Sequence, residues 1–240
     1  MDILLDLLNN NLMVIVAGAV GGLLGLLVSH REIRKIIRLL RTSTSEIGML
    51  PSEGQVEMVG SADGGTTTIS PITKTTCALW QVEVLEKRSS GKSSHWVTIY
   101  KNTSTSPFDI SDGTGKMRIY PSRYTELILR DDVRKSSGVF SSLDEETQAV
   151  LQIAGITTKG ALFNRALRVY ERYIEPGESI YLLGTVYSKN GTRILDDESP
   201  LIISDQSELR LLSRFIWRVV MNALIGAVAF LALADKIINR

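Results

Sequence analysis

The sequence predicts a mainly β fold, a small barrel-like β-domain with one or two helices, flanked by two transmembrane helices. Two observations carry this prediction. Apolar residues concentrate near both ends of the 240-residue chain, and the polar middle is a series of short strand-like runs separated by turn residues. The expected parts are a tail with the first transmembrane helix (1–29), a basic amphipathic linker helix (30–47), a β-rich domain (48–206) and a second transmembrane helix with its tail (207–240).

The first predicted span is Leu12–Val28, LMVIVAGAVGGLLGLLV, which carries no charge. It is short, because roughly 20 residues cross the hydrocarbon core of a bilayer, but the apolar residues before it can add length. A cleaved signal peptide would have a basic start and a small-residue cleavage site. Here the start carries Asp2 and Asp6, and the segment runs directly into basic residues, which favours an uncleaved anchor.

The second predicted span is Phe215–Ala234, FIWRVVMNALIGAVAFLALA. Arg218 lies within it, but only one turn from its start, where a long side chain can extend to the lipid headgroups. Trp217 suits the aromatic belt at the membrane interface. The alternative interpretation is a buried helix of a soluble domain.

Basic residues flank the middle of the chain and predict its orientation. The N-terminal tail has no Lys or Arg, and the C-terminal tail has only Lys236 and Arg240. By the positive-inside rule the β-domain should face the cytoplasm, with both termini on the external side of the inner or plasma membrane. The flanking residues are Arg31, Arg34, Lys35, Arg38 and Arg41 after the first span, and Arg210 and Arg214 before the second.

The linker after the first span has an amphipathic helical pattern. Ile33, Ile36, Ile37 and Leu40 recur at i, i+3, i+4 and i+7, and the five cations that follow the first span take the other face. Such a helix can lie on an anionic lipid surface, with those five cations as its lipid contacts. Alternatively it continues the first span and packs against the domain, and the sequence leaves both open.

Small residues recur at intervals of four in both spans, and this spacing lets helices approach closely in lipid. Asn222 adds a polar group that can bond across such a contact. The spans are expected to pack, either with each other or between the subunits of a homo-oligomer. The candidate packing residues are Gly18, Gly21, Gly22, Gly25, Asn222, Ala223 and Ala227.

The middle region reads as a series of strands with one helix, which predicts a closed or partly closed barrel. Residues 77–88 and 94–104 flank SSGKSS and predict a long hairpin, and the Asn-Gly pair in SKNGT (188–192) predicts another. Further strands are expected at 54–60, 115–121, 124–130, 166–174, 179–188 and 193–197. Ser142 and Glu145 have capping-box spacing for the helix, and Asp205 with Glu208 can cap the helix that leads into the second span.

Composition excludes several classes of function. The 27 basic and 26 acidic side chains nearly balance, which argues against a general nucleic-acid binder. The one cysteine, Cys77, is expected to be buried and inert, and with His30 and His95 it cannot supply the four ligands of a structural zinc site. The pairs Asp131–Asp132 and Asp196–Asp197 end strands and are interpreted as solvated turn charges. No catalytic, cofactor or metal site is therefore expected.

The stretch PFDISDGTGKMRIYP (107–121) looks like a phosphate loop at first, with Gly113, Gly115 and Lys116 in close order. A P-loop needs a leading glycine, where Ile110 stands, and a Ser or Thr after the lysine, where a methionine stands, and it opens a helix. Strand-like residues follow here instead. DGTG is therefore predicted to be a hairpin turn whose glycines take positive φ.

The arrangement of the chain resembles the GIDE family, membrane-bound E3 ubiquitin ligases of the mitochondrial MULAN type and their prokaryotic relatives, whose middle region is called the Beside-A-Membrane domain. The resemblance covers most of the chain and lies in GQVEMVG, SPITKTTCALWQVEV, PFDISDGTGKMRIYP and ERYIEPGESIYLLGTV. The matching residues are Gly54, Val56, Ser70, Pro71, Cys77, Pro107, Phe108, Asp112, Glu171, Pro176, Gly177 and Gly184.

The sequence departs from the family at one point that matters for function. Eukaryotic members carry a zinc-binding RING, whereas this chain has one cysteine and extends six residues past the predicted second span. We therefore expect no ligase activity. The leading hypothesis is a non-catalytic two-span membrane protein whose cytoplasmic β-domain binds a protein or small-molecule partner and self-associates, with the defence or stress role that the resemblance implies. The rivals are a self-assembling, membrane-perturbing effector triggered through the β-domain, and an enzyme with an unrecognised site.

Overall fold

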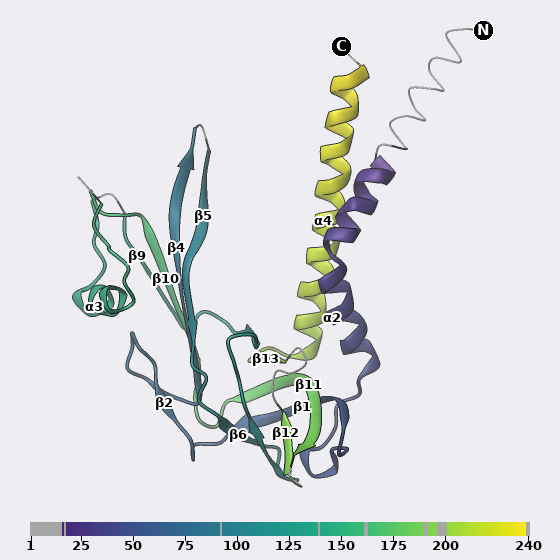
Figure 1. The fold of residues 1–240 in the computed structure, drawn as a ribbon, viewed down its shortest axis with the longest axis vertical. Helices are drawn as coiled ribbons and strands as arrows, with labels where there is room; N and C mark the ends of the chain where they lie inside the picture. The colour runs from purple at the N-terminus through teal and green to yellow at the C-terminus, as the bar shows by residue number, and fades with distance from the viewer. Residues whose placement is uncertain are drawn as a thin grey trace. The chain divides into compact units, whose positions relative to one another are not determined.

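The structure is a computed structural model, and it describes residues 16, 18–91, 93–138, 140–160, 163–189, 192–195 and 201–238. The chain forms two compact units (Figure 1). One is a β-domain, Thr44–Gln206. The other is a helical unit made by the described residues of Met1–Ser43 and Ser207–Arg240.

Five strands of the β-domain close into a barrel. Hydrogen-bonded neighbours follow the order β1, β6, β7, β12 and β11, and β11 pairs again with β1, which closes the ring. β11 also pairs with β13, which continues to β8. The strands are β1 Gly54–Ala62, β6 Phe108–Ser111, β7 Lys116–Ile119, β8 Glu126–Ile128, β11 Ser179–Lys189, β12 Thr192–Leu195 and β13 Ile202–Ser204.

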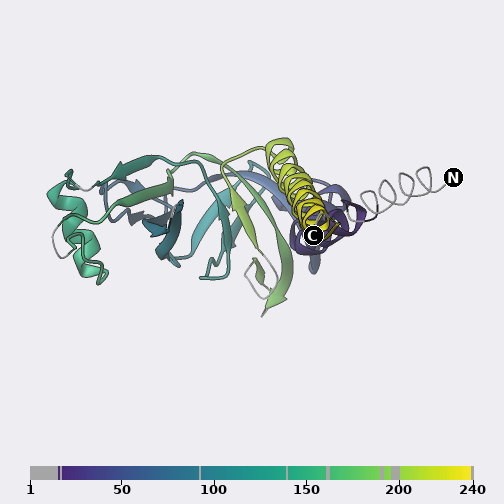
Figure 2. The same cartoon turned by 90° about the horizontal axis from the view of Figure 1, so that it is seen from above.

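A second, four-stranded antiparallel sheet has the order β5, β4, β10, β9. Its helix α3 lies beside β9 (Figures 1 and 2), where Lys135 of β9 donates to the Thr147 hydroxyl at 2.9 Å. The elements are β4 Leu79–Ser90, β5 Ser93–Thr103, β9 Val133–Ser136, α3 Glu145–Ile153 and β10 Leu167–Ile174; β2 Thr68–Ile69, β3 Thr76–Cys77 and the 3-10 turn η1 Ile47–Met49 complete the domain.

Each sheet has its own apolar core. The barrel encloses fully buried side chains that include Met58, Phe108 and Leu182. The second core lies between the four-stranded sheet and α3, and it includes Val84, Leu151, Val169 and others. The side chains of β4 and β10 point alternately to the two faces of the sheet, so every second side chain along each strand enters this second core.

The mainly β fold and the barrel predicted from the sequence are confirmed. The second sheet was not predicted, because strand patterns give the number of strands and not their division between sheets. The hairpin over 77–104 is confirmed, and its pairing continues to Ser90 and Ser93 around Gly91, whose φ is +60°. The Asn190–Gly191 turn and Asp196–Asp197 lie outside the described residues, but β11 and β12 pair as the predicted hairpin.

The predicted cap of α3 is wrong. Asp144, and not Ser142, is the N-cap: its Oδ1 accepts from the backbone N of Thr147 at 2.9 Å and from the Thr147 hydroxyl at 2.8 Å. The Thr147 and Lys135 contacts hold the pKa of Asp144 at about 2, although partial desolvation works against them. Asp205, the predicted cap of the last helix, instead accepts from Arg130.

The DGTG stretch is the predicted hairpin turn, between β6 and β7. Gly113 has a φ of +88°, as expected, but Gly115 does not lie in the left-handed region. A Cβ on Gly115 would lie 3.0 Å from the backbone N of Gly48, so close approach explains this glycine. Asp112 holds the turn together by accepting from Ile47 N at 2.7 Å and Thr114 N at 2.9 Å, and these bonds lower its pKa to about 2.

This geometry predicts opposite outcomes for two neighbouring substitutions. Gly115→Val should destabilise the domain by about 1–3 kcal/mol, because the new side chain overlaps Gly48. Lys116→Ala should change stability by less than about 0.5 kcal/mol, because its side chain is 69% exposed and its contact with Asp63 is a surface ion pair. Chemical unfolding of the two variants measures both effects. Loss of ATP binding in folded Lys116→Ala would instead revive the phosphate-loop interpretation.

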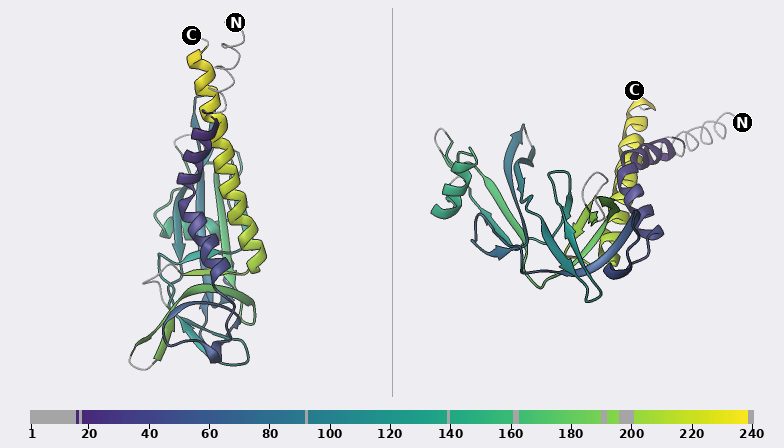
Figure 3. Two further views of the ribbon diagram at one scale, coloured as in Figure 1. Left: turned by 90° about the vertical axis from the view of Figure 1, so that its right-hand side faces the viewer. Right: turned by 60° about the horizontal axis from the view of Figure 1, so that its bottom comes forward.

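The helical unit contains an apolar helix, Gly18–Val28, followed by α2, His30–Arg41, and the long helix α4, Glu208–Ile238. The helices run side by side (Figure 3, left). Within the described residues one segment, Glu208–Ala232, is long and apolar enough to cross a membrane, with a mean hydropathy of 1.9. Only 6% of its apolar window is buried, which distinguishes it from a soluble core helix. Gly18–Val28 is shorter, and residues 12–15 and 17 of the predicted first span lie outside the described residues.

Candidate functional site: a basic sheet face beside a carboxylate cluster

The outer face of the four-stranded sheet is set by the alternation of β10. Leu167, Val169 and Glu171 are buried, so Arg168, Tyr170 and the intervening positions of the neighbouring strands point the opposite way. Register places β4 and β5 residues beside them on this face. We call the set the basic–aromatic face; it consists of Lys87, Trp96, Lys101, Arg134, Arg168, Tyr170 and Arg172, with Glu83 near its centre.

Arginine guanidinium groups lie over the aromatic rings of this face. The Arg168 guanidinium carbon lies 3.9 Å from the centre of the Trp96 ring. Arg134 and Arg172 lie 5.5 Å and 5.4 Å from the Tyr170 ring centre. Such contacts hold the cations near the rings and stabilise the face through cation–π attraction.

The charges on the face are only partly neutralised. Arg172 is fully engaged, since it donates to Asp131 Oδ1 at 2.7 Å and to Glu83 Oε2 at 3.0 Å. Lys87, Lys101, Arg134 and Arg168 have no carboxylate partner among the described residues. These four cations therefore leave the face with an excess of positive charge.

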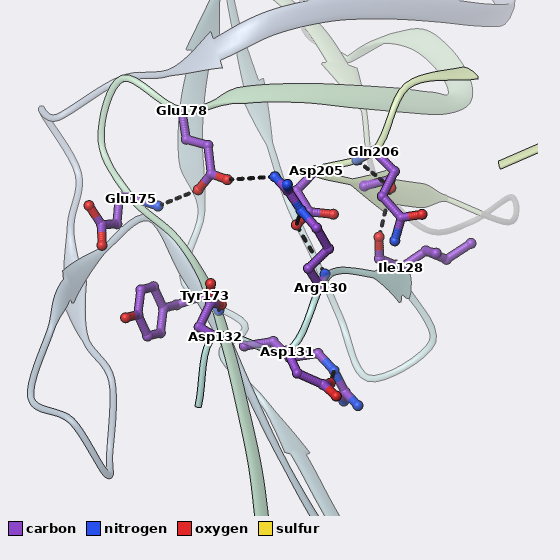
Figure 4. A network of polar contacts seen from close by, with 11 residues as sticks. Ile128, Arg130, Asp131, Asp132, Tyr173, Glu175, Glu178, Asp205 and Gln206 are labelled. Atoms are coloured by element: carbon purple, nitrogen blue, oxygen red, sulfur yellow. Dashed lines mark hydrogen bonds and ion pairs between the residues drawn. The ribbon is translucent and has the colours of Figure 1, made fainter. Parts of the chain in front are cut away.

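A cluster of carboxylates adjoins this face through Asp131 (Figure 4). Arg130 lies at its centre and donates from N and Nε to Asp205 Oδ2, both at 3.0 Å, while its Nη2 lies 4.0 Å from Glu178 Oε1. Asp132 accepts from the backbone N of Tyr173 at 2.7 Å. One arginine is therefore shared among Asp132, Glu178 and Asp205, which we call the carboxylate cluster.

Two members of the carboxylate cluster, Asp132 and Glu178, have raised pKa values. Desolvation raises the pKa values of Asp132 and Glu178, and repulsion from Asp205 adds to the shift. Hydrogen bonding from Arg130 to Asp205 raises the arginine's own pKa. Asp205 is 5% exposed, and its Oδ1 has no hydrogen-bond partner in the described structure. Asp131 and Asp132 are both exposed, as the sequence predicted; Asp131 pairs with Arg172, and Asp132 differs from an ordinary turn charge in its raised pKa.

The raised pKa predicts that Glu178→Gln stabilises the protein at neutral pH. A carboxyl whose pKa is higher in the folded state loses folding stability as the pH rises from its ordinary value of 4.5 through the raised value. The amide removes this loss, while its oxygen can still accept from Glu175 N. Urea unfolding at several pH values should show the gain at pH 7 and none below pH about 4.

Asp109→Asn provides the opposite control. The Arg118 guanidinium, at 2.8 Å, lowers the pKa of Asp109, so its charge stabilises the fold above the ordinary pKa. This variant should be less stable than the wild type at pH 7. If Glu178→Gln also loses stability there, the carboxylate cluster is held together by its charges and the titration argument fails.

The structure brings together some of the predicted packing glycines and separates others. A Cβ on Gly21 would overlap the backbone of Gly226, and a Cβ on Gly25 would lie 2.7 Å from Ala223 Cα. Gly18 lies beside Leu231, but Gly22 faces open space, with nothing within 4 Å. The prediction grouped Gly22 with the packing glycines and missed Gly226, although the latter lies four residues after Asn222.

Polar contacts accompany this packing. Asn222 Nδ2 donates to the Ser29 hydroxyl at 3.0 Å, and that hydroxyl donates to the carbonyl of Gly25 at 3.0 Å. Arg218 lies 3.5 Å from Glu32, so the arginine inside the predicted second span has a partner on α2. Ala227 is half-buried on α4. The two helical segments therefore pack within one chain.

The basic residues of α2 do not share one environment. Arg31, Arg34 and Arg41 are exposed, whereas Arg38 is half-buried and Lys35 contacts Glu32 at 3.4 Å and the ring of Phe215. The apolar pattern also differs from the packing. Leu39 is buried, but Ile37 and Leu40, which belong to the predicted apolar face, are 41% and 66% exposed. α2 thus follows the first helix and packs along α4, and its contact with lipid stays a prediction.

Comparison with known proteins identifies the family. Neither the curated proteins nor the solved structures that were compared with the chain gave a match. A family model, GIDE, described as an E3 ubiquitin ligase, matches residues 81–236. The matched range is well over half of the 240 residues, and it contains nearly all of the four-stranded sheet, the carboxylate cluster and most of α4. The chain therefore belongs to the GIDE family.

Proposed function

We propose that this GIDE-family chain is a membrane-anchored, non-catalytic binding protein whose β-domain holds an anionic partner on the basic–aromatic face. The observation that carries the proposal is a set of four cations on one sheet face to which the described residues offer no carboxylate partner, Lys87, Lys101, Arg134 and Arg168. Three arginines elsewhere in the domain, Arg118, Arg130 and Arg165, pair with carboxylates instead. A cluster of unpaired cations attracts and orients an anionic partner.

The absence of ligase chemistry in these 240 residues is part of the proposal. A RING domain is built on zinc sites with four Cys or His ligands each, and this sequence contains only Cys77, His30 and His95. Among the described residues no group of three or more metal-binding side chains gathers. A role in holding a partner at a membrane needs neither zinc nor a nucleophile.

The topology is proposed from the sequence and is testable. The basic residues on both sides of the β-domain support a cytoplasmic domain with external termini. A reporter fused after Arg240 should therefore give an external signal, and one inserted within 188–192 a cytoplasmic signal. The reverse pattern would show the opposite orientation. Two signals from the same side would show that the chain does not cross the membrane after the β-domain.

The rival function, a self-assembling membrane effector, has less support. It depends on small residues that are free to meet other subunits. Gly21, Gly25 and Gly226 are already used for packing within the chain, which leaves Gly22 as the open member of the set.

Binding to anionic probes tests the proposed function. The full chain, in nanodiscs of zwitterionic lipid, is mixed with fluorescent polyglutamate, heparin and an oligonucleotide, and anisotropy measures affinity. At least one probe should bind, and the double substitution Arg134→Ala with Arg168→Ala should weaken that binding at least about tenfold. Arg123→Ala is the matched control, since the Arg123 guanidinium also lies over an exposed ring, 4.8 Å from the centre of Tyr124. Equal losses in the control and the double variant would contradict the proposal.

A further inference from the structure

We infer that the anionic partner of the basic–aromatic face is a single-stranded nucleic acid. This inference rests on the proposed function and identifies the chemistry of its partner. The near-zero net charge of the chain predicted no nucleic-acid binding. Net charge, however, averages over a molecule whose charges are segregated. The face carries the unpaired cations, and the carboxylate cluster gathers beyond Asp131.

The first argument is the shape of the surface. The cations project from a four-stranded antiparallel sheet, and two of the aromatic–arginine contacts centre on Arg168 and Tyr170 of the inner strand β10. An extended peptide would add along a sheet edge, where its backbone can pair. The charges lie across the sheet, so they fit a ligand that lies on its face. Bases can do so, because aromatic rings and guanidinium planes are the groups on which unpaired bases stack.

The second argument is the spacing of planar and charged groups. Arg168 and Tyr170 are two residues apart on one face of β10, or about 6.6 Å along the strand. Each has a cation–π partner: Arg168 lies over Trp96, and both Arg134 and Arg172 lie over Tyr170. They form two adjacent stacking platforms. Lys87 and Lys101, from β4 and β5, are exposed and available to phosphates.

The third argument concerns Glu83, whose carboxylate favours a nucleic acid over an acidic peptide as the ligand. This carboxylate lies opposite Lys101 near the centre of the face, and it accepts from Thr98 at 3.0 Å and from Arg172 at 3.0 Å. An acidic peptide would gain nothing from a central carboxylate and would be repelled by it. The N–H donors on base edges, including the N3–H of thymine, can in contrast donate to its remaining lone pairs.

The test compares two ligands that have the same number of phosphate groups but differ in whether they carry bases. The full chain in zwitterionic nanodiscs is titrated with fluorescent oligothymidine about 10 nucleotides long, and with an abasic strand of equal length. Oligothymidine should bind more tightly. Arg168→Ala and Tyr170→Leu should each weaken the binding of oligothymidine by about tenfold. The difference in affinity between oligothymidine and the abasic strand should therefore become smaller. Lys87→Ala and Lys101→Ala should each reduce the slope of log affinity against log salt by about 0.7.

Arg123→Ala and Tyr124→Leu are the controls, because they remove the same chemistry from another part of the domain. Circular dichroism confirms that each variant is folded. If the abasic strand or polyglutamate binds as tightly as oligothymidine, the nucleic-acid inference is overturned while the anionic-partner function stands. If no probe binds, both are overturned. If the control substitutions weaken the binding of oligothymidine as much as the substitutions on the basic–aromatic face do, the binding is non-specific. In that case the inference is again wrong.

Discussion

Replacing Glu171 with alanine should destabilise the β-domain by at least about 3 kcal/mol, a large part of the roughly 5–15 kcal/mol that keeps a domain folded. Glu171 is fully buried on β10, and its carboxylate accepts three hydrogen bonds. They come from the backbone N of Ile72 at 2.7 Å, the backbone N of Thr73 at 2.9 Å and the Thr73 hydroxyl at 2.6 Å. Alanine would leave these donors without their acceptor.

The Glu171 carboxylate binds the loop that contains Ile72, Thr73 and Lys74. Its loss should therefore destabilise this loop as well as the strand β10. Ile72 packs into the second core, and Lys74 follows with a φ of +58°, which a lysine rarely adopts. The Glu171 contacts help to maintain this conformation. Amide hydrogen exchange at Ile72 and Thr73 should therefore accelerate in Glu171→Ala, together with the loss of global stability in urea.

Glu175→Ala is the control, since Glu175 lies just past the end of the same strand and is exposed. It should change stability by no more than about 0.5 kcal/mol. An equally small effect of Glu171→Ala would mean that the loop keeps its conformation without the carboxylate. The three hydrogen bonds to Glu171 would then contribute little to stability.

Burial, with a contribution from Glu171, explains the state of the single cysteine. Burial and the neighbouring Glu171 charge raise the pKa of the Cys77 thiol to about 11. At neutral pH the thiol is therefore protonated and a poor nucleophile. The sequence predicted a buried Cys77, and the structure confirms it.

Local signals explain which parts of the fold were predictable. The glycines at 91 and 113 mark two hairpin turns because both need a positive φ that other residues avoid. The alternation of apolar residues located β1, β10 and β11. These signals depend on a few neighbouring residues, so they do not depend on how the strands are arranged into sheets.

Long-range contacts explain what the sequence could not predict. The donors to Glu171 lie 98 and 99 residues away along the chain, so no spacing rule connects them. The basic–aromatic face is similar, because Trp96, Arg134 and Arg168 come from three strands whose order was unknown. The alternation of Arg168, Tyr170 and Arg172 on β10 was visible in the sequence, and it was the one available signal for this face.

The same limit applies to the helices, where the spacing of glycines showed that close packing was possible but not which glycines take part. Gly25→Leu should separate the first helix from α4, because the new side chain would overlap the backbone of Asn222 and Ala223. In lipid there is little hydrophobic drive between helices, so this loss of close packing is not compensated. The hydrogen bond from Asn222 to Ser29 would be lost with it.

Gly22→Leu is the matched control, since a Cβ there meets nothing within 4 Å. A crosslink between Gly18→Cys and Leu231→Cys, in a Cys77→Ala background, reports the helix contact, because a Gly18 Cβ would lie 3.6 Å from the Leu231 side chain. The crosslink should form with Gly22→Leu and fail with Gly25→Leu. If Gly22→Leu instead reduces the particle mass in detergent while the crosslink persists, Gly22 faces a neighbouring subunit. Crosslinking that survives in Gly25→Leu would show that the observed helix contact does not depend on the glycine.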